Sequence, residues 1–462
     1  MTTHHVAVIG AGASGSLLTV HLLRQAPPGT RITLIERNAP FGPGLAFATG
    51  HRNHVLNVPA GRMSAFADRP RHFVDWLERQ PEQILDGAQP SETGFMPRRL
   101  YGAYLRHLLN TAAHDAALDT LHDSVVAVAA DGPPTLDLAS GRSIPADMVV
   151  LATGNDQPAV PGHIPGLCEA PQWRPDPWSP TAFATLDPRA AVLLIGTGLT
   201  MVDAVVTLLD QGHRGPIHAV SRRGLLPRPH APAGPPRSLP PLPTCLGALT
   251  RLVRAEAEQA GDAWRGVIDA LRPATQAAWQ ALTIEERGRF LRHLRPWWDV
   301  HRHRTPQAIA ERIDAARAAG QLQVHAGRIT GCATAGAALD LRLRRRDGTT
   351  GTLRVARVVN CTGPCTDVTR SADPLLRALL QDGLVQPDSC HLGLQTTDAG
   401  AVVGRDGEAS TTLFALGPLT RGMFWEVTAI PDIRRQCEAL AQHLAHVMSE
   451  PARERRGRLA YA

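Results

Sequence analysis

Two stretches of the chain repeat one pattern of hydrophobic and polar positions. Residues 5–36 and 191–223 each contain an apolar run, a glycine-containing turn, an apolar segment with helical spacing and a second apolar run. Apolar runs that alternate with helical segments predict βαβ units and a parallel sheet. We therefore expect an α/β protein with two Rossmann-like dinucleotide-binding domains.

The first turn carries Gly10, Gly12 and Gly15 in a GxGxxG arrangement. In this motif the first glycine permits the tight turn, and the second lets the backbone approach a pyrophosphate. The third lets the helix pack closely on the strand. The next apolar run ends at Glu36, where a carboxylate accepts hydrogen bonds from ribose hydroxyls. These residues predict an FAD site.

The second turn keeps Gly196 and Gly198 but has Met201 in place of the third glycine. At the position that corresponds to Glu36 it has Arg222, followed by Arg223. Guanidinium groups at this position favour the 2′-phosphate of NADPH. In both units the start of the helix presents free N–H groups to the phosphates. The second unit therefore predicts an NADPH site.

Two further apolar runs, at residues 146–151 and 353–360, end in the similar turns Ala-Thr-Gly and Cys-Thr-Gly. We predict that they are the crossover strands of a flavoprotein with two dinucleotide domains. Residues 246–319 have helical spacing and little strand propensity, which predicts a helical insertion. The resulting domain prediction is an FAD-binding domain of residues 1–160 plus 355–462, and an NADPH-binding domain of residues 161–354 that contains the insertion 246–319.

The composition removes several classes of protein. All 48 basic residues are arginines, so the lysine that a Schiff base, a PLP site or a P-loop requires is missing. The arginines are dispersed, so despite the net charge of +6 we expect no nucleic-acid partner. The seven cysteines form no CxxC pair and the histidines lack ligand spacing, so we expect neither a redox dithiol nor a metal site. No apolar run is long enough to span a membrane, and we expect a cytoplasmic protein without membrane contact.

Several segments resemble the bacterial FAD/NAD(P)-binding proteins of the YdhS type, which are related to flavin-dependent N-hydroxylating monooxygenases. The matching text includes IGAGASG, HVLNVPAGRMSAF, LIGTGLTMVD, VSRRG, RPWWDVHRHR and GPLTRGMFWEVTAIPDIR. The resemblance implies the fold and both cofactors. The chain departs from the related flavoproteins at Pro418, because those proteins usually have an aspartate there that contacts the ribityl chain of the flavin.

The cofactor residues follow from the two turns, the crossover strand and the C-terminal strand. For FAD we expect Gly10, Gly12, Ser14, Gly15, Glu36, Arg37, Asn57, Val126, Thr153, Gly154, Gly417 and Leu419. For NADPH we expect Gly196, Gly198, Leu199, Thr200, Ser221, Arg222 and Arg223.

The candidates for the substrate pocket come from three segments, one of which is residues 421–426, just after Gly417. Asn57 lies in the polar, turn-rich segment 53–64, where it is placed to meet the isoalloxazine edge. Trp297, Trp298 and His301 lie late in the helical insertion of a chain with only 4% aromatic residues. We expect the insertion to cap the flavin and to form part of the pocket; core packing of both tryptophans is the alternative.

The resemblance and the motifs together favour an NADPH-dependent FAD monooxygenase. It would use O₂, through a C4a-hydroperoxyflavin, to hydroxylate a small soluble substrate, as N-hydroxylases do. One alternative is an NAD(P)H-dependent flavin reductase or oxidase that inserts no oxygen. Another is a non-catalytic flavin-binding protein, which the departures at Met201 and Pro418 would suit.

Overall fold

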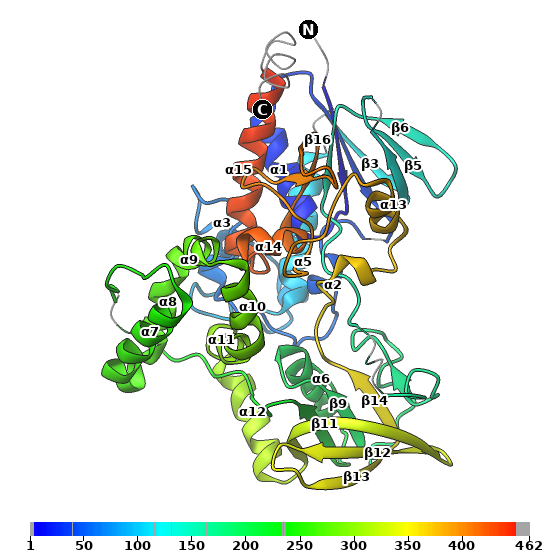
Figure 1. Ribbon diagram of the computed structural model, residues 1–462, viewed down its shortest axis with the longest axis vertical. Helices are drawn as coiled ribbons and strands as arrows, with labels where there is room; N and C mark the ends of the chain where they lie inside the picture. The colour runs from blue at the N-terminus through cyan, green and yellow to red at the C-terminus, as the bar shows by residue number, and fades with distance from the viewer. Residues whose placement is uncertain are drawn as a thin grey trace. The chain divides into compact units, whose positions relative to one another are not determined.

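The chain folds into two compact units. The computed structural model describes residues 4–38, 40–113, 117–130, 132–159, 161, 164–232, 234 and 237–449. The first unit comprises Met1–Arg52, Val58–Asn155 and Thr366–Ala462, and the second comprises Asn53–Asn57 and Asp156–Cys365. Figure 1 shows the helices and strands of each unit with their labels.

The first unit is built on a six-stranded sheet with the order β15-β16-β7-β1-β2-β3. Its strands are β1 (His5–Ile9), β2 (Arg31–Glu36), β3 (Leu118–His122), β7 (Met148–Leu151), β15 (Ala401–Val403) and β16 (Ala409–Ala415). All neighbours pair in parallel except β15, which is antiparallel to β16. Every residue of β7 is buried, as expected for a parallel strand covered on both faces.

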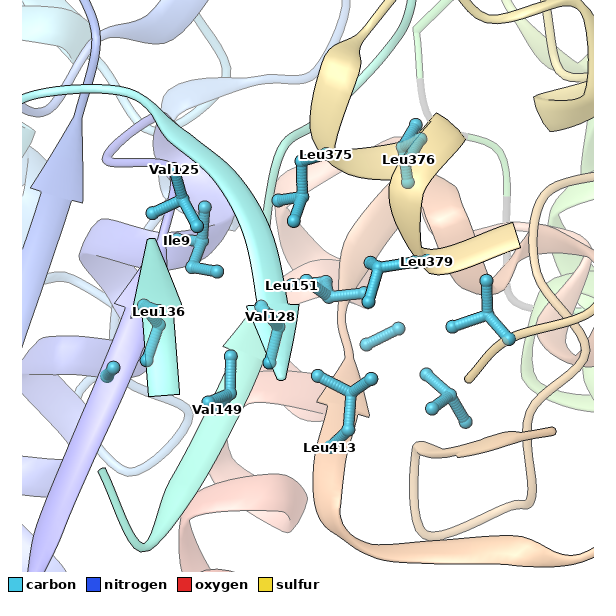
Figure 2. Packing of buried hydrophobic residues seen from close by; sticks show 14 of the residues in the cluster. Ile9, Val125, Val128, Leu136, Val149, Leu151, Leu375, Leu376, Leu379 and Leu413 are labelled. Atoms are coloured by element: carbon cyan, nitrogen blue, oxygen red, sulfur yellow. The ribbon is translucent and has the colours of Figure 1, made fainter. Parts of the chain in front are cut away.

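Helices and a small second sheet cover this sheet. Helix α1 (Ala13–Gln25) packs on β1 and β2, with α5 (Arg98–Ala112) and α15 (Ile430–Ser449) beside it. A three-stranded antiparallel sheet is formed by β4 (Val125–Ala129), β5 (Thr135–Leu138) and β6 (Ser143–Pro145). Together with α13 (Pro374–Asp382), it shares one hydrophobic cluster with strands of the six-stranded sheet. Figure 2 shows Leu375, Leu376 and Leu379 of α13 facing the strand residues of this cluster.

The remaining short elements of the first unit connect these layers. They are α2 (Gly44–Phe47), α3 (His72–Glu78), α4 (Glu82–Leu85), α14 (Arg421–Phe424) and the 3-10 helices η1 (Ala60–Arg62), η4 (Val368–Arg370) and η5 (Gly417–Thr420). Strand β3 was not predicted from the sequence. Its residues are only partly buried or exposed, so its apolar pattern is weak.

The second unit is built on a seven-stranded sheet with the order β13-β12-β11-β10-β9-β14-β8. Its strands are β8 (Trp173–Arg174), β9 (Val192–Ile195), β10 (Ile217–Ser221), β11 (Leu322–Ala335), β12 (Ala338–Arg345), β13 (Thr350–Val355) and β14 (Arg357–Asn360). Neighbouring strands pair in parallel across β8, β14, β9, β10 and β11. Strands β12 and β13 extend the sheet with antiparallel pairing. The two-domain α/β architecture predicted from the sequence is thus confirmed.

The predicted strand at residues 353–360 is in fact two strands. Val355 ends β13, which pairs with β12, and Arg357 begins β14, which pairs in parallel with β9. Both strands belong to the second unit, so the prediction that residues 355–365 belong to the FAD domain is wrong. The apolar run did not reveal the break at Ala356, because each half remains extended and only its pairing partner changes.

The region 246–319 is helical, as predicted, but not all of it is an insertion. Its helices are α7 (Leu246–Ala260), α8 (Trp264–Leu271), α9 (Thr275–Ala281), α10 (Ile284–His293), α11 (Arg295–Arg302) and α12 (Gln307–Ala318), with the 3-10 helices η2 (Gly261–Ala263) and η3 (Arg272–Ala274). Helix α12 packs on α6 (Leu199–Asp210) and β11, and its apolar residues join the core of the second unit. It therefore connects the parallel strands β10 and β11, and the inserted part ends before it.

Candidate dinucleotide-binding sites

The two glycine turns have the same backbone architecture. Gly10 and Gly196 both have left-handed backbone angles, with φ of 102° and 117°. The N–H of Gly10 donates to the carbonyl of Ile35, and that of Gly196 to the carbonyl of Val220, each over 2.8 Å. Each turn is therefore held to the end of the strand that follows its helix, β2 or β10.

Each crossover turn closes on the first glycine of its unit. A Cβ on Gly10 would lie 2.5 Å from the carbonyl oxygen of Ala152, and a Cβ on Gly196 would overlap that of Cys361. The N–H groups of Ala152 and Cys361 donate to the last residue of β1 and β9, each over 2.8 Å. The predicted Ala-Thr-Gly and Cys-Thr-Gly turns thus occupy equivalent places at the carboxyl ends of the two sheets, where parallel α/β sheets bind ligands.

The second glycine of each turn precedes an open helix N-terminus. Gly12 and Gly198 cap α1 and α6 with extended backbone and no side-chain cap, so the first N–H groups of each helix remain for another acceptor. A Cβ on Gly198 would meet nothing within 4 Å. Leu199 and Thr200, in the first turn of α6, are half-buried.

The third position differs between the two turns. A Cβ on Gly15 would overlap the carbonyl oxygen of Gly10, so close packing in the first unit requires glycine there. The corresponding Met201 is fully buried in the core of the second unit. Helix α6 therefore accommodates a side chain where α1 cannot.

The carboxylate of Glu36 holds the first glycine turn in place. It accepts hydrogen bonds from the N–H groups of Ala11, over 2.8 Å, and Asn38, over 3.0 Å. The side chain is only half-buried, and its remaining lone pairs can accept further bonds. The side chain of Arg37 does not join these bonds; it forms an ion pair of 2.8 Å with Asp373 at the start of α13.

The C-terminal turn meets the start of α1. Gly417 has a φ of 69°, and a Cβ there would lie 2.6 Å from the Oγ of Ser14, so these two predicted residues are neighbours. The N–H of Gly417 donates to Gln436 over 2.9 Å, and the amide of Gln436 donates to the Thr420 hydroxyl over 2.7 Å. Leu419 is buried. Gln436 was missed by sequence reasoning because α15 brings it to this turn from a distance.

Another segment near the first turn was also missed. The N–H of Gly42 donates to the carbonyl of Ala11 over 2.8 Å, and a Cβ on Gly44 would lie 2.8 Å from the Cα of Gly12. The sequence signal was the text FGPGLAF directly after β2. Other predicted FAD residues are less enclosed: Val126, Thr153 and Gly154 are all half-buried.

The ends of β9 and β10 are tied together by hydroxyl groups. The Oγ1 of Thr197 lies 2.9 Å from the Oγ of Ser221 and donates to the carbonyl of Leu225 over 2.6 Å. The Oγ of Ser221 also accepts the N–H of Gly224 over 3.0 Å. Ser221 is thus engaged within the protein, where it shapes the loop that carries the two arginines.

Arg222 and Arg223 lie in different surroundings. Arg222 is exposed and has no ion pair with any residue that the structure describes. Arg223 lies with its guanidinium carbon 5.9 Å from the ring centre of Trp297, and its Nη2 is 3.4 Å from the carbonyl of His293. Arg222 is therefore available to an anionic ligand, whereas Arg223 contacts the helical insertion.

Asn57 belongs to the second unit. Its carbonyl accepts a hydrogen bond of 3.1 Å from Nε2 of His230, whose backbone N–H donates to the carbonyl of Thr305 over 2.9 Å. Burial lowers the pKa of His230, which keeps its ring neutral near pH 7. Asn57 is therefore held against His230, whose backbone pairs with the segment that follows α11.

Trp264 is the centre of a cluster in the same region. The ring of His301 meets its edge with centroids 4.9 Å apart, and the guanidinium carbon of Arg304 lies 5.9 Å from its centre. Arg304 is buried, donates to the carbonyl of His301 over 3.0 Å and pairs with Asp269. Sequence reasoning missed Trp264 and Arg304, although Trp264 is one of only eight tryptophans in the chain.

The predicted pocket residues thus divide into two groups. Residues 228 and 230 bond to residues 300 and 305; His301 lies on the second of these segments and beside Trp264, and Asn57 contacts the first through His230. Trp297 lies against Arg223 instead, and Trp298 is half-buried.

The thiols, possible metal ligands and helices complete the survey of sites. All seven cysteines are free, and burial raises the pKa of the Cys361 and Cys437 thiols well above the ordinary value. Within the described ranges, no three His, Cys, Asp or Glu side chains gather as a metal site would require. Nor is any helix of those ranges both long and apolar enough to cross a membrane.

Comparison with known proteins agrees with the geometry. Residues 7–156 match the family model described as FAD-NAD(P)-binding. A search of the curated proteins gives no match. The family match covers the first glycine turn, Glu36 and the crossover turn, and it confirms the predicted class of cofactors.

Solved structures share the fold over nearly the whole chain. The ornithine N-hydroxylase of Kutzneria sp. 744, solved with reduced FAD, NADP⁺ and L-ornithine, is 16% identical, with 97% of this chain and 100% of that chain covered and a TM-score of 0.64. L-lysine 6-monooxygenase from Pseudomonas syringae is 17% identical, with coverage of 96% and 99% and a TM-score of 0.64. The bacillithiol disulfide reductase of Bacillus cereus is 16% identical, with coverage of 96% and 100% and a TM-score of 0.56. The chain therefore has the fold of two-dinucleotide flavoproteins.

Proposed function

We propose that this protein is an NADPH-dependent flavoprotein monooxygenase that hydroxylates a small soluble substrate, with N-hydroxylation as the favoured reaction. The observation that carries the proposal is the pair of glycine turns with equal backbone geometry: the first bonds the carboxylate of Glu36, and the second bonds the carbonyl of Val220, two residues before the exposed Arg222. The higher TM-score of 0.64 with the ornithine N-hydroxylase and the L-lysine 6-monooxygenase, against 0.56 with the disulfide reductase, supports oxygenation over simple electron transfer.

The first unit is proposed to hold FAD, which when bound supplies hydride acceptance and oxygen activation. Gly12 and the open start of α1 would receive its pyrophosphate, since backbone N–H groups and the helix dipole favour anions there. Glu36 would accept hydrogen bonds from ribose while its bond to Ala11 keeps the turn in place. Ser14 and Gly417 bring the C-terminal turn to the same helix end.

The second unit is proposed to hold NADPH. The open position at Gly198 would admit the pyrophosphate, and Arg222 would contact the 2′-phosphate. Arginine suits this role because its charge is permanent and its planar fork of donors matches a phosphate.

The substrate pocket is proposed to include Asn57 and His301, with Trp264 packed against His301. The ion pair of the buried Arg304 with the exposed Asp269, and the bond of Arg304 to the His301 carbonyl, would fix this wall. A wall of this kind would keep water away from the bound substrate.

Rapid-mixing kinetics test the proposal. The purified holoprotein is reduced anaerobically with NADPH or with NADH and is then mixed with oxygenated buffer. We expect faster bleaching with NADPH, a delayed return of the oxidised-flavin absorbance, and peroxide below one equivalent when a substrate is present. Immediate reoxidation with one equivalent of peroxide would identify a reductase or oxidase. An absence of bleaching with either nucleotide would identify a non-catalytic flavin-binding protein.

A further inference from the structure

Trp297 is unusually exposed for a tryptophan in this chain. Its residue exposure is 43%, and it is the one aromatic among the large hydrophobic residues that are exposed in the described ranges. The others are Leu45, Ile84 and Ile284. Tryptophan is enriched at binding surfaces, because its ring is large and apolar while its N–H can still contact water.

The backbone of Trp297 is fixed at the corner between α10 and α11, and its indole contacts Arg223. The backbone N–H of Trp297 donates to Leu294 over 2.9 Å, and its carbonyl lies 2.7 Å from Nδ1 of His301. Arg223 reaches across from the end of β10, with its guanidinium 5.9 Å from the indole centre and its Nη2 3.4 Å from the carbonyl of His293. The α10–α11 corner is therefore attached to the loop after β10.

This loop is the place where the adenosine end of a dinucleotide is expected. In a βαβ unit the ribose of the adenosine lies beside the residue that ends the second strand, and here β10 ends at Ser221. Arg222 follows directly, exposed and without an ion pair among the residues described. An anion at Arg222 and an aromatic base near Arg223 and Trp297 would match the two ends of a 2′-phosphorylated adenosine.

We propose that Trp297 is the stacking platform for the adenine of NADPH, with Arg223 orienting the indole and Arg222 contacting the 2′-phosphate. The proposal rests on the proposed NADPH site. It assigns the α10–α11 corner of the helical insertion to nucleotide recognition within the second unit, a role different from the flavin cap expected from the sequence. Stacking suits this position because an indole face left open to solvent binds any flat base.

Adenosine 2′,5′-bisphosphate is the probe, because it carries the adenine and the 2′-phosphate but no nicotinamide. Its dissociation constant is measured calorimetrically on the FAD-loaded protein for the wild type and for Trp297→Ala, Trp297→Phe and Ile284→Ala. Stacking of one base on an aromatic side chain corresponds to about 5- to 150-fold in affinity. We expect a loss of this size for Trp297→Ala and a much smaller loss for Trp297→Phe, which keeps an aromatic face.

The control variant separates stacking from general surface effects. Ile284 is also an exposed hydrophobic residue of the insertion, at 60% exposure, so Ile284→Ala should bind the probe like the wild type. Thermal melts of the variants exclude unfolding as the cause of a loss. If the wild type binds the probe and Trp297→Ala binds it equally well, the stacking proposal is overturned, whereas the proposed NADPH site still stands. A wild type that does not bind the probe would overturn the NADPH assignment itself.

Discussion

Replacing Gly198 by alanine should separate nucleotide binding from folding. Gly198 has ordinary backbone angles for any residue, with φ of −85° and ψ of −165°, and a Cβ there would meet nothing within 4 Å. The new methyl group would therefore enter only the space above the start of α6. That is the space in which we expect the pyrophosphate of NADPH.

The two effects on stability nearly cancel. Gly→Ala at a compatible position stabilises a protein by about 0.4–1 kcal/mol, because the unfolded chain loses freedom. Alanine is a poorer helix N-cap than glycine by roughly 0.5–1 kcal/mol. The net change in unfolding free energy should therefore stay within about 1 kcal/mol. Losing one charge-assisted hydrogen bond to phosphate costs about 1.5–3 kcal/mol, which corresponds to roughly 10- to 150-fold in affinity.

The assay pairs a thermal melt with calorimetric titration of NADP⁺ into the FAD-loaded variant. Gly196→Ala is the contrasting variant, because φ of 117° and the overlap with the Cys361 carbonyl should prevent normal folding of the second unit. If Gly198→Ala melts like the wild type and binds NADP⁺ equally well, the second glycine turn is not the phosphate site, and the reasoning fails.

Three further outcomes are expected. Gly12→Val should abolish FAD retention because its branched side chain occupies the approach to the start of α1, and a normally yellow Gly12→Val protein would contradict the FAD assignment. Arg222→Ala should reduce the preference for NADPH over NADH by roughly 10- to 150-fold with nearly unchanged NADH kinetics; equal use of both nucleotides by the wild type would refute this. Unfolding by urea should become easier as the pH falls below about 6.5, because the unfolded chain then binds protons that the folded histidines resist. A midpoint that is constant between about pH 7.5 and about pH 5.5 would argue against that linkage. The histidines whose pKa burial lowers are His5, His21, His72, His213, His218, His230 and His325.

The parts of the fold that local pattern controls were predictable. A buried strand, a glycine turn and an amphipathic helix lie within about thirty residues of one another in a βαβ unit, so the chain reveals each unit directly. The equal offsets of Glu36 and Arg222 therefore indicated two different ribose environments. The crossover turns after β7 and β14 were recognisable for the same reason, since apolar strands ending in small residues are local signals.

Features that depend on distant pairing were not predictable. Residues 353–360 are one apolar run, yet Ala356 separates a strand that pairs with β12 from a strand that pairs with β9. Helix α12 has the same spacing as the inserted helices, and only its contacts with α6 and β11 place it in the core of the second unit. Hydrophobic periodicity states which face of an element is buried but not which partner buries it.

The sequence by itself determined the class of the protein: two dinucleotide-binding turns, one beside a carboxylate and one beside arginines. The tertiary structure alone decided how the two arginines differ, because Arg222 and Arg223 are adjacent and chemically identical in the sequence. It leaves Arg222 in solvent and sets Arg223 against Trp297, over seventy residues away. Contacts between segments so far apart arise from the packing of whole helices on the sheet, and no local pattern of residues encodes them.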